Sequence, residues 1–179
     1  VYIDLVLSVG MILFGVNFNL YYLVLQGRVK SALKSDELRW YLGIIAAATL
    51  LIAWNILPQL GNIWQSLRYA FFQVRSIITT TGFATTDFNL WPELSRCILL
   101  VLMLLGACAG STGGGIKTSR LVIMLRSARK EISRLLHPRS VRSLKFEGKA
   151  LEDDTVRNVF IYFFIMIVLI GISVLLVSL

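Results

Sequence analysis

The chain has 179 residues, of which 56% are hydrophobic and 16% are charged, and its mean hydropathy is +0.74. Soluble globular domains contain roughly 45–50% apolar and about 25% charged residues, so the composition excludes an ordinary soluble domain. The net charge of +8 does not indicate a nucleic-acid partner, because four of the 18 Lys and Arg residues lie at 28–39 and eleven at 117–157. Clustered positive charge between apolar segments is typical of the cytoplasmic loops of a membrane protein.

Three apolar stretches, residues 1–25, 41–57 and 156–179, predict transmembrane spans in an all-α membrane protein. Polar residues at 26–40 predict a cytoplasmic loop, and residues 137–155 predict a cytoplasmic connector. Ser35 is expected to cap the second span. Asn17 and Asn19 lie inside the first span, where they predict either a hydrogen bond between helices or contact with an ion. Because both ends of the sequence are apolar, we expect a fragment of a longer protein.

Residues 66–78 predict a pore helix. Its apolar part, 67–78, would be about 18 Å long as a helix, which cannot cross a ~30 Å hydrocarbon core. The segment is therefore either re-entrant or an amphipathic helix outside the membrane, and Arg68 and Arg75 keep the second alternative open. In a pore helix, we expect Arg75 to face a carboxylate or water, away from any ion.

Residues 79–87 predict a filter loop. The negative end of the preceding helix favours a cation there, and extended backbone carbonyls can replace the hydration shell of potassium. The predicted filter residues are Thr80, Thr81, Gly82 and Phe83, with the Thr80 and Thr81 hydroxyls as further potassium ligands. A plain threonine-rich turn between two helices is the alternative.

Residues 94–136 predict a transmembrane helix broken by a glycine-rich loop at 110–115, whose members are Gly110, Ser111, Thr112, Gly113, Gly114 and Gly115. We interpret this loop as a flexible gate; a simple kink is the bland alternative. A phosphate-binding loop needs Gly-Lys-[Ser/Thr] after a β-strand, whereas here Ile116 separates Gly115 from Lys117. A membrane enzyme using this loop for phosphate, or a non-conducting scaffold, are the competing hypotheses.

Three motifs carry a resemblance: Asn17-Phe18-Asn19-Leu20-Tyr21-Tyr22 with Asp36-Glu37-Leu38-Arg39, the segment 79–88 (TTTGFATTDF), and the segment 106–117 (GACAGSTGGGIK). Together they resemble the TrkH-type membrane subunits of bacterial Trk potassium uptake systems, in the Trk/Ktr/HKT superfamily. The resemblance implies four repeats of span, re-entrant pore helix, filter loop and broken span around one pore. The chain would carry the end of repeat two, all of repeat three and the start of repeat four.

The resemblance also implies a multi-pass protein of the bacterial inner membrane that takes up potassium, with symport as an expected mode. It implies a homodimer, surrounding lipid, and a cytoplasmic nucleotide-binding regulatory subunit of the TrkA type. It implies neither enzymatic activity nor an organic cofactor. Ala84 stands where potassium-channel filters carry a second glycine, so we expect the outermost ion site to be less channel-like.

Overall fold

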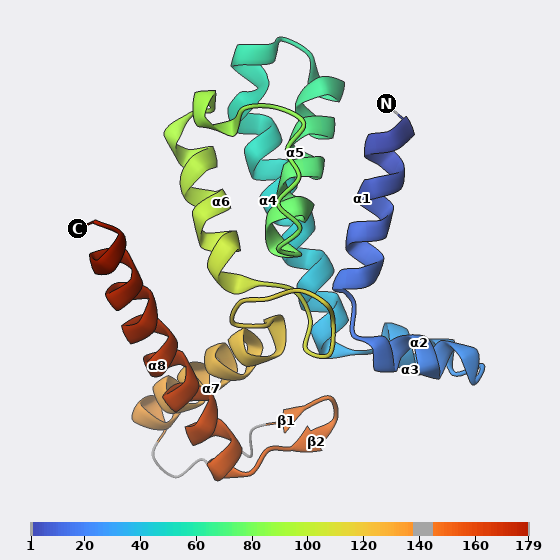
Figure 1. The fold of residues 1–179 in the computed structure, drawn as a ribbon. Coiled ribbons are helices and arrows are strands. Elements are labelled where there is room, and N and C mark those ends of the chain that lie inside the picture. Colours follow the sequence, from blue (N-terminus) through green and yellow to red (C-terminus); the bar gives the residue numbers. More distant parts are fainter. Residues whose placement is uncertain (1, 138–144, 179) are drawn as a thin grey trace. The chain divides into compact units, whose positions relative to one another are not determined.

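The computed structural model describes residues 2–137 and 145–178, and these are mostly helical (Figure 1). The chain divides into two compact units, residues 1–119 and 120–179. The first unit contains α1 (Tyr2–Gly15), α2 (Phe18–Leu25), α3 (Val29–Leu33), α4 (Asp36–Leu60), α5 (Ile63–Ile78), the 3-10 helix η1 (Phe88–Leu90) and α6 (Glu93–Leu105). The second contains nearly all of α7 (Thr118–Leu136), then β1 (Lys145–Phe146), β2 (Lys149–Ala150) and α8 (Asp153–Val177).

The first predicted span, 1–25, is not one straight helix: α1 and α2 meet at an angle of 91°. Asn17 lies at the bend in an extended conformation, and its side chain accepts a hydrogen bond from the Asn19 N–H at 2.9 Å. An asparagine in this position caps a new helix. Asn17 also donates from Nδ2 to Glu37 Oε2 at 3.4 Å, so the interhelical alternative describes it better than an ion contact.

The second predicted span is longer than residues 41–57. Helix α4 begins at Asp36, where the Ser35 hydroxyl accepts from the Leu38 N–H at 3.3 Å, and it runs through Pro58 to Leu60. The expected cap at Ser35 is therefore confirmed, and the predicted cytoplasmic loop at 26–40 contains α3 and the first turn of α4. Among the described residues, α4 and α8 are each long and apolar enough to cross a membrane, and the bent pair α1 and α2 is a third possibility by length and composition.

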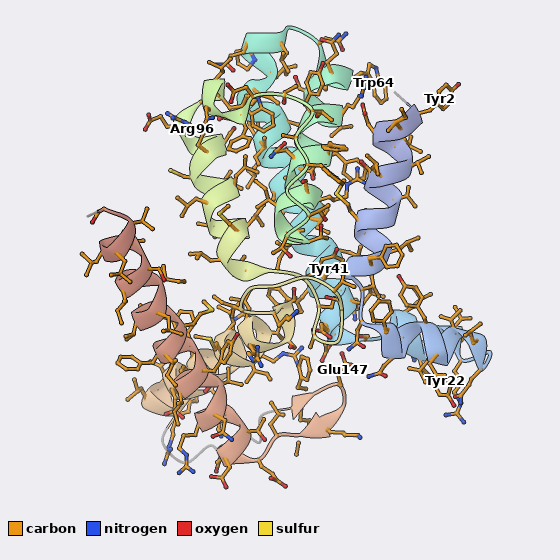
Figure 2. The ribbon with its side chains drawn as sticks, viewed as in Figure 1. Tyr2, Tyr22, Tyr41, Trp64, Arg96 and Glu147 are labelled. Atoms are coloured by element: carbon orange, nitrogen blue, oxygen red, sulfur yellow. The ribbon has the colours of Figure 1, made fainter. Side chains whose placement is uncertain are left out.

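Helices α4, α5 and α6 pack against one another, and α1 packs against α5. Figure 1 shows α5 running opposite to α4, with α6 beside them. Their shared core is apolar: Tyr41, Ile45, Ile52 and Ile56 from α4, Ala70, Val74 and Ile78 from α5, and Leu99 and Leu102 from α6. Figure 2 shows Tyr41 inside this unit, whereas Tyr2 and Trp64 project outward near one end of it. An outward aromatic side chain at one end of a bundle is typical of a membrane–water interface.

The second unit contains an antiparallel hairpin, in which Lys145 pairs with Ala150 and Phe146 with Lys149. Its turn is Glu147-Gly148, and both residues have positive φ, as a two-residue hairpin turn requires. The hairpin lies within the predicted cytoplasmic connector at 137–155; residues 138–144 of that connector lie outside the described part. Helix α8 begins at Asp153, three residues before the predicted 156, because two aspartates in its first turn suit the positive end of a helix.

Candidate filter and gate site

Helix α5 ends inside the first unit, and the chain then reverses direction. At about 24 Å for 16 residues, α5 is too short to cross a ~30 Å core. It begins at Ile63, three residues before the predicted 66, because the Asn62 side chain accepts from the Trp64 N–H at 3.0 Å. Figure 1 shows the chain after α5 running back alongside the helix toward η1. Since α5 packs against α1, α4 and α6, the geometry favours a re-entrant helix over one outside the bundle.

The threonine cluster forms a tight, hydrogen-bonded turn at the end of α5. Thr79 Oγ1 donates to the Arg75 carbonyl at 2.7 Å and lies 2.8 Å from Thr81 Oγ1. Thr80 has φ of 56° and Gly82 has φ of 83°. A β-branched residue at positive φ is strained, and such strain persists where the surroundings determine the conformation. The turn is therefore held by specific contacts rather than by local preference.

Three of the four predicted filter carbonyls are open. In the described part of the chain, no backbone N–H donates to the carbonyls of Thr80, Thr81 or Gly82. The Phe83 carbonyl differs, because it accepts from Ser76 Oγ at 2.5 Å, which turns it back toward α5. Residues 80–83 are all exposed on the first unit. Within the described ranges, the carbonyls of Thr80, Thr81 and Gly82 are therefore free of backbone N–H donors, while the Phe83 carbonyl keeps one lone pair.

The glycine-rich break is longer than the predicted 110–115. Helix α6 ends at Leu105 and α7 begins at Thr118, so residues 106–117 have irregular backbone. This loop folds against the end of α1, where Cys108 N donates to the Gly15 carbonyl at 3.1 Å and Thr112 N to the Phe14 carbonyl at 3.4 Å. At its downstream end, Thr118 N donates to the Ala107 carbonyl at 2.9 Å. The loop, interpreted from the sequence as a flexible gate, is thus held by hydrogen bonds at several points in this structure.

Close packing explains two of the glycines. A Cβ on Gly106, whose φ is +69°, would collide with the carbonyl of Gly114. A Cβ on Gly113 would lie 2.9 Å from the Cβ of Ala107 and 3.5 Å from the Thr79 carbonyl. The first distance is shorter than real Cβ contacts allow, so a side chain at Gly113 requires the loop to shift.

The predicted filter and the predicted gate are in direct contact. The Gly114 N–H donates to Thr80 Oγ1 at 3.0 Å, and the same hydroxyl donates to the Thr79 carbonyl at 2.7 Å. The Thr80 hydroxyl is thus bonded to the glycine-rich loop and keeps one lone pair. One side chain couples the two irregular segments.

Lys117 does not occupy the position of a phosphate-binding lysine. Its Nζ donates to the Gly113 carbonyl, and its backbone has φ of 69°. The amine is therefore bonded within its own loop. A phosphate-binding loop would instead direct backbone N–H groups and the lysine amine at a common anion.

Arg75 is buried, with 1% of its surface exposed. Its Nε donates to the Phe71 carbonyl at 2.8 Å, and its guanidinium lies over the Phe71 ring. Among the described residues, Nη2 has no hydrogen-bond partner, so of the two expected partners, a carboxylate or water, the carboxylate is not found there. Arg75 lines a cavity of about 510 Å³ between α1 and α5, with the ion pair of Asp4 and Arg68 also on its wall.

Two residues of this site were not singled out from the sequence as site residues. Ser76 binds the Phe83 carbonyl, and its backbone carbonyl accepts from Thr81 N at 2.9 Å. Glu37 is buried and its Oε1 accepts from the Ala109 N–H at 2.6 Å. The sequence signal for Glu37 was its place as an acidic residue just inside the start of a helix. That signal indicates a helix cap as well as it indicates a contact with the loop.

The fold is that of an all-α membrane protein. It has apolar helices of spanning length, a short helix inside the bundle and two irregular segments in contact. The family described as "TrkH: Cation transport protein" matches residues 1–179, and the chain belongs to this family. The family consists of cation transport proteins and not of enzymes.

Individual relatives agree with this assignment. The chain is 33% identical over 166 residues to the Trk system potassium uptake protein TrkH of Salmonella typhimurium, which covers 90% of the chain and 34% of that relative. It is 33% identical over 168 residues to TrkG of Escherichia coli, with 91% and 34% covered. The crystal structure of the potassium transporter TrkH from Vibrio parahaemolyticus superimposes with a TM-score of 0.83 at 32% identity, with 90% of this chain and 36% of that chain covered. The chain thus spans about a third of the length of these relatives.

Proposed function

We propose that this chain is part of the pore-forming subunit of a potassium uptake system in the bacterial inner membrane. In this proposal, the chain supplies the last span of a second repeat, a complete third repeat and the first span of a fourth. The observation that carries it is the turn at the end of α5, where three open carbonyls lie beside a glycine-rich loop bonded to the same turn.

The backbone carbonyls of Thr80, Thr81 and Gly82 would replace the hydration water around a potassium ion. The C-terminal end of α5, whose partial charge is negative, favours a cation at this position. One repeat cannot surround an ion, so equivalent loops of the other repeats would complete the ring. The loop at 106–117 would act as the gate, because it contacts the filter turn from the side of the α6 break.

The family resemblance supports three further parts of the proposal. The complete protein would be a multi-pass homodimer, surrounded by lipid, and a cytoplasmic nucleotide-binding subunit of the TrkA type would regulate it. The basic helix α7, with Arg126, Arg129, Lys130 and Arg134, has the positive charge expected of a cytoplasmic segment. Transport could be coupled to another ion as symport.

The test is rubidium uptake by the complete protein in liposomes, with sodium as competitor, comparing wild type with Gly82→Ser. Gly82 has φ of +83°, so a side chain there distorts the filter turn. The matched control is Gly43→Ser in α4, where an added Cβ meets nothing within 4 Å. Potassium-selective uptake that weakens only in Gly82→Ser supports the filter. Absence of uptake with and without a regulatory subunit would favour a scaffold, and selectivity unaffected by Gly82→Ser would move the filter elsewhere.

A further inference from the structure

Glu37 is a buried carboxylate at the start of α4, with 4% of its surface exposed. It lies in the first turn of the helix, where the positive end of the helix dipole stabilises a negative charge. A carboxylate is costly to bury unless hydrogen-bond donors surround it. The groups that donate hydrogen bonds to the Glu37 carboxylate therefore indicate the role of this residue.

The two carboxylate oxygens bind two segments that are distant in sequence. Oε1 accepts from the Ala109 N–H at 2.6 Å. Oε2 lies 3.4 Å from Nδ2 of Asn17 at the bend between α1 and α2. Glu37 thus joins the start of α4, the bend and the first part of the glycine-rich loop.

The bond to Ala109 lies within a short stretch that is fixed on several sides. The preceding residue, Cys108, donates to the Gly15 carbonyl at 3.1 Å, and the carbonyl of the following Gly110 accepts from Phe18 N at 3.1 Å. Farther along the loop, Gly114 is bonded to the Thr80 hydroxyl instead. The loop therefore has a base at 108–110, bonded to α1, α2 and α4, and a middle bonded to the filter turn through Gly114 and to the end of α1 through Thr112.

We propose that Glu37 is a positioning residue for the gate: it fixes the base of the loop, so that opening involves the part from Ser111 to Lys117. This inference rests on the proposed function of the loop. Glu37 does not contact the ion in this mechanism. Its effect depends on the reach of the side chain to the Ala109 N–H, rather than on its charge alone.

Reach and charge can be separated by two substitutions in the complete protein. Glu37→Gln keeps the length and an oxygen acceptor for Ala109 N–H but removes the charge. Glu37→Asp keeps the charge and its favourable place at the helix start but withdraws the oxygens by one methylene. Glu93→Gln is the control, because Glu93 is also in the first turn of a helix but is exposed and bonded to Arg96.

The first measurement is rubidium uptake into liposomes without the regulatory subunit, relative to uptake with it. We expect Glu37→Asp to raise unregulated uptake about tenfold, the effect of losing one strong hydrogen bond, with the preference for potassium over sodium retained. Glu37→Gln and Glu93→Gln should remain close to wild type. The reverse order, or wild-type behaviour of Glu37→Asp, would overturn the inference.

The second measurement uses Cys108, which is fully buried beside Ala109, as a reporter of the loop base. A thiol reagent is added to the reconstituted variants, and labelling of the peptide that contains Cys108 is quantified by mass spectrometry. Faster labelling in Glu37→Asp than in Glu37→Gln supports the inference, and equal rates refute it. Cys97 in α6, which is exposed, gives the reference rate.

These outcomes are independent of the test of the proposed function. If the wild-type protein transports no potassium, the proposed function fails, whereas labelling of Cys108 still tests whether Glu37 fixes the loop base. If wild-type uptake is potassium-selective and regulated but the two Glu37 variants do not differ, only the positioning role fails.

Discussion

The Thr80 hydroxyl provides the sharpest test of coupling between filter and gate. It accepts from the Gly114 N–H at 3.0 Å and donates to the Thr79 carbonyl at 2.7 Å. Thr80→Val removes the hydroxyl but keeps the size and the β-branching of the side chain, so the strain at φ of 56° is nearly unchanged. The bond is exposed, so losing it costs about 0.5–1.5 kcal/mol, the net contribution of a typical hydrogen bond. Because 1.4 kcal/mol is a factor of ten, release of the loop should become about 2- to 12-fold more favourable.

The assay is rubidium uptake and single-channel recording of the complete reconstituted protein. We expect Thr80→Val to raise open probability while the ratio of potassium to sodium flux stays at the wild-type value. Thr80→Ser keeps the hydroxyl and should gate as the wild type does. A lower flux with weaker discrimination would show instead that the hydroxyl is an ion ligand. Unchanged gating in Thr80→Val would refute the coupling.

Three further predictions follow from the glycines. Gly113→Ala places a Cβ 2.9 Å from the Cβ of Ala107. It should lower stability in detergent by about 1–3 kcal/mol, measured by thermal unfolding, and alter gating, measured by rubidium uptake. The control Gly10→Ala, whose added Cβ has nothing within 4 Å, should leave both nearly unchanged. Gly82→Ala at φ of +83° should cost about 1–2 kcal/mol and weaken potassium selectivity, and selectivity equal to wild type in competition uptake would contradict this. Gly15→Ala would push a Cβ into the Tyr41 hydroxyl and within 2.9 Å of Thr79 Cγ2. We expect reduced recovery of folded protein on size-exclusion chromatography, and normal recovery would contradict the tight packing of Gly15 against Tyr41 and Thr79.

Local signals predicted much of the fold. The Ser35 cap, the apolar character of α4 and α8, and the short α5 all follow from residue type and spacing along a helix. The glycine run correctly predicted a break in the helix that begins near Leu94. In each case the determining residues lie within a few positions of the feature.

Features that depend on distant contacts were not predictable. The 91° bend at Asn17 involves Glu37 and Gly110, which the sequence does not reveal as neighbours. Helix α6 ends at Leu105 because Gly106 lies against the backbone of Gly114, and this contact appears only when the loop is folded. The burial of Arg75 without the expected carboxylate among the described residues likewise depends on tertiary packing. The strands of the hairpin have two residues each, which is too short to give an alternating pattern of apolar and polar residues.

The bonds from the loop to α1 have a consequence for how the protein is made. The Phe14 and Gly15 carbonyls accept from Thr112 and Cys108, which the ribosome adds more than ninety residues later. Contacts of large sequence separation form late in folding, and chains fold from the N-terminal side during synthesis. Helix α1 is therefore a template that must already be inserted when the loop emerges. A chain expressed without α1 would contain every residue of the loop at 106–117 and still lack the surface on which that loop acquires its shape.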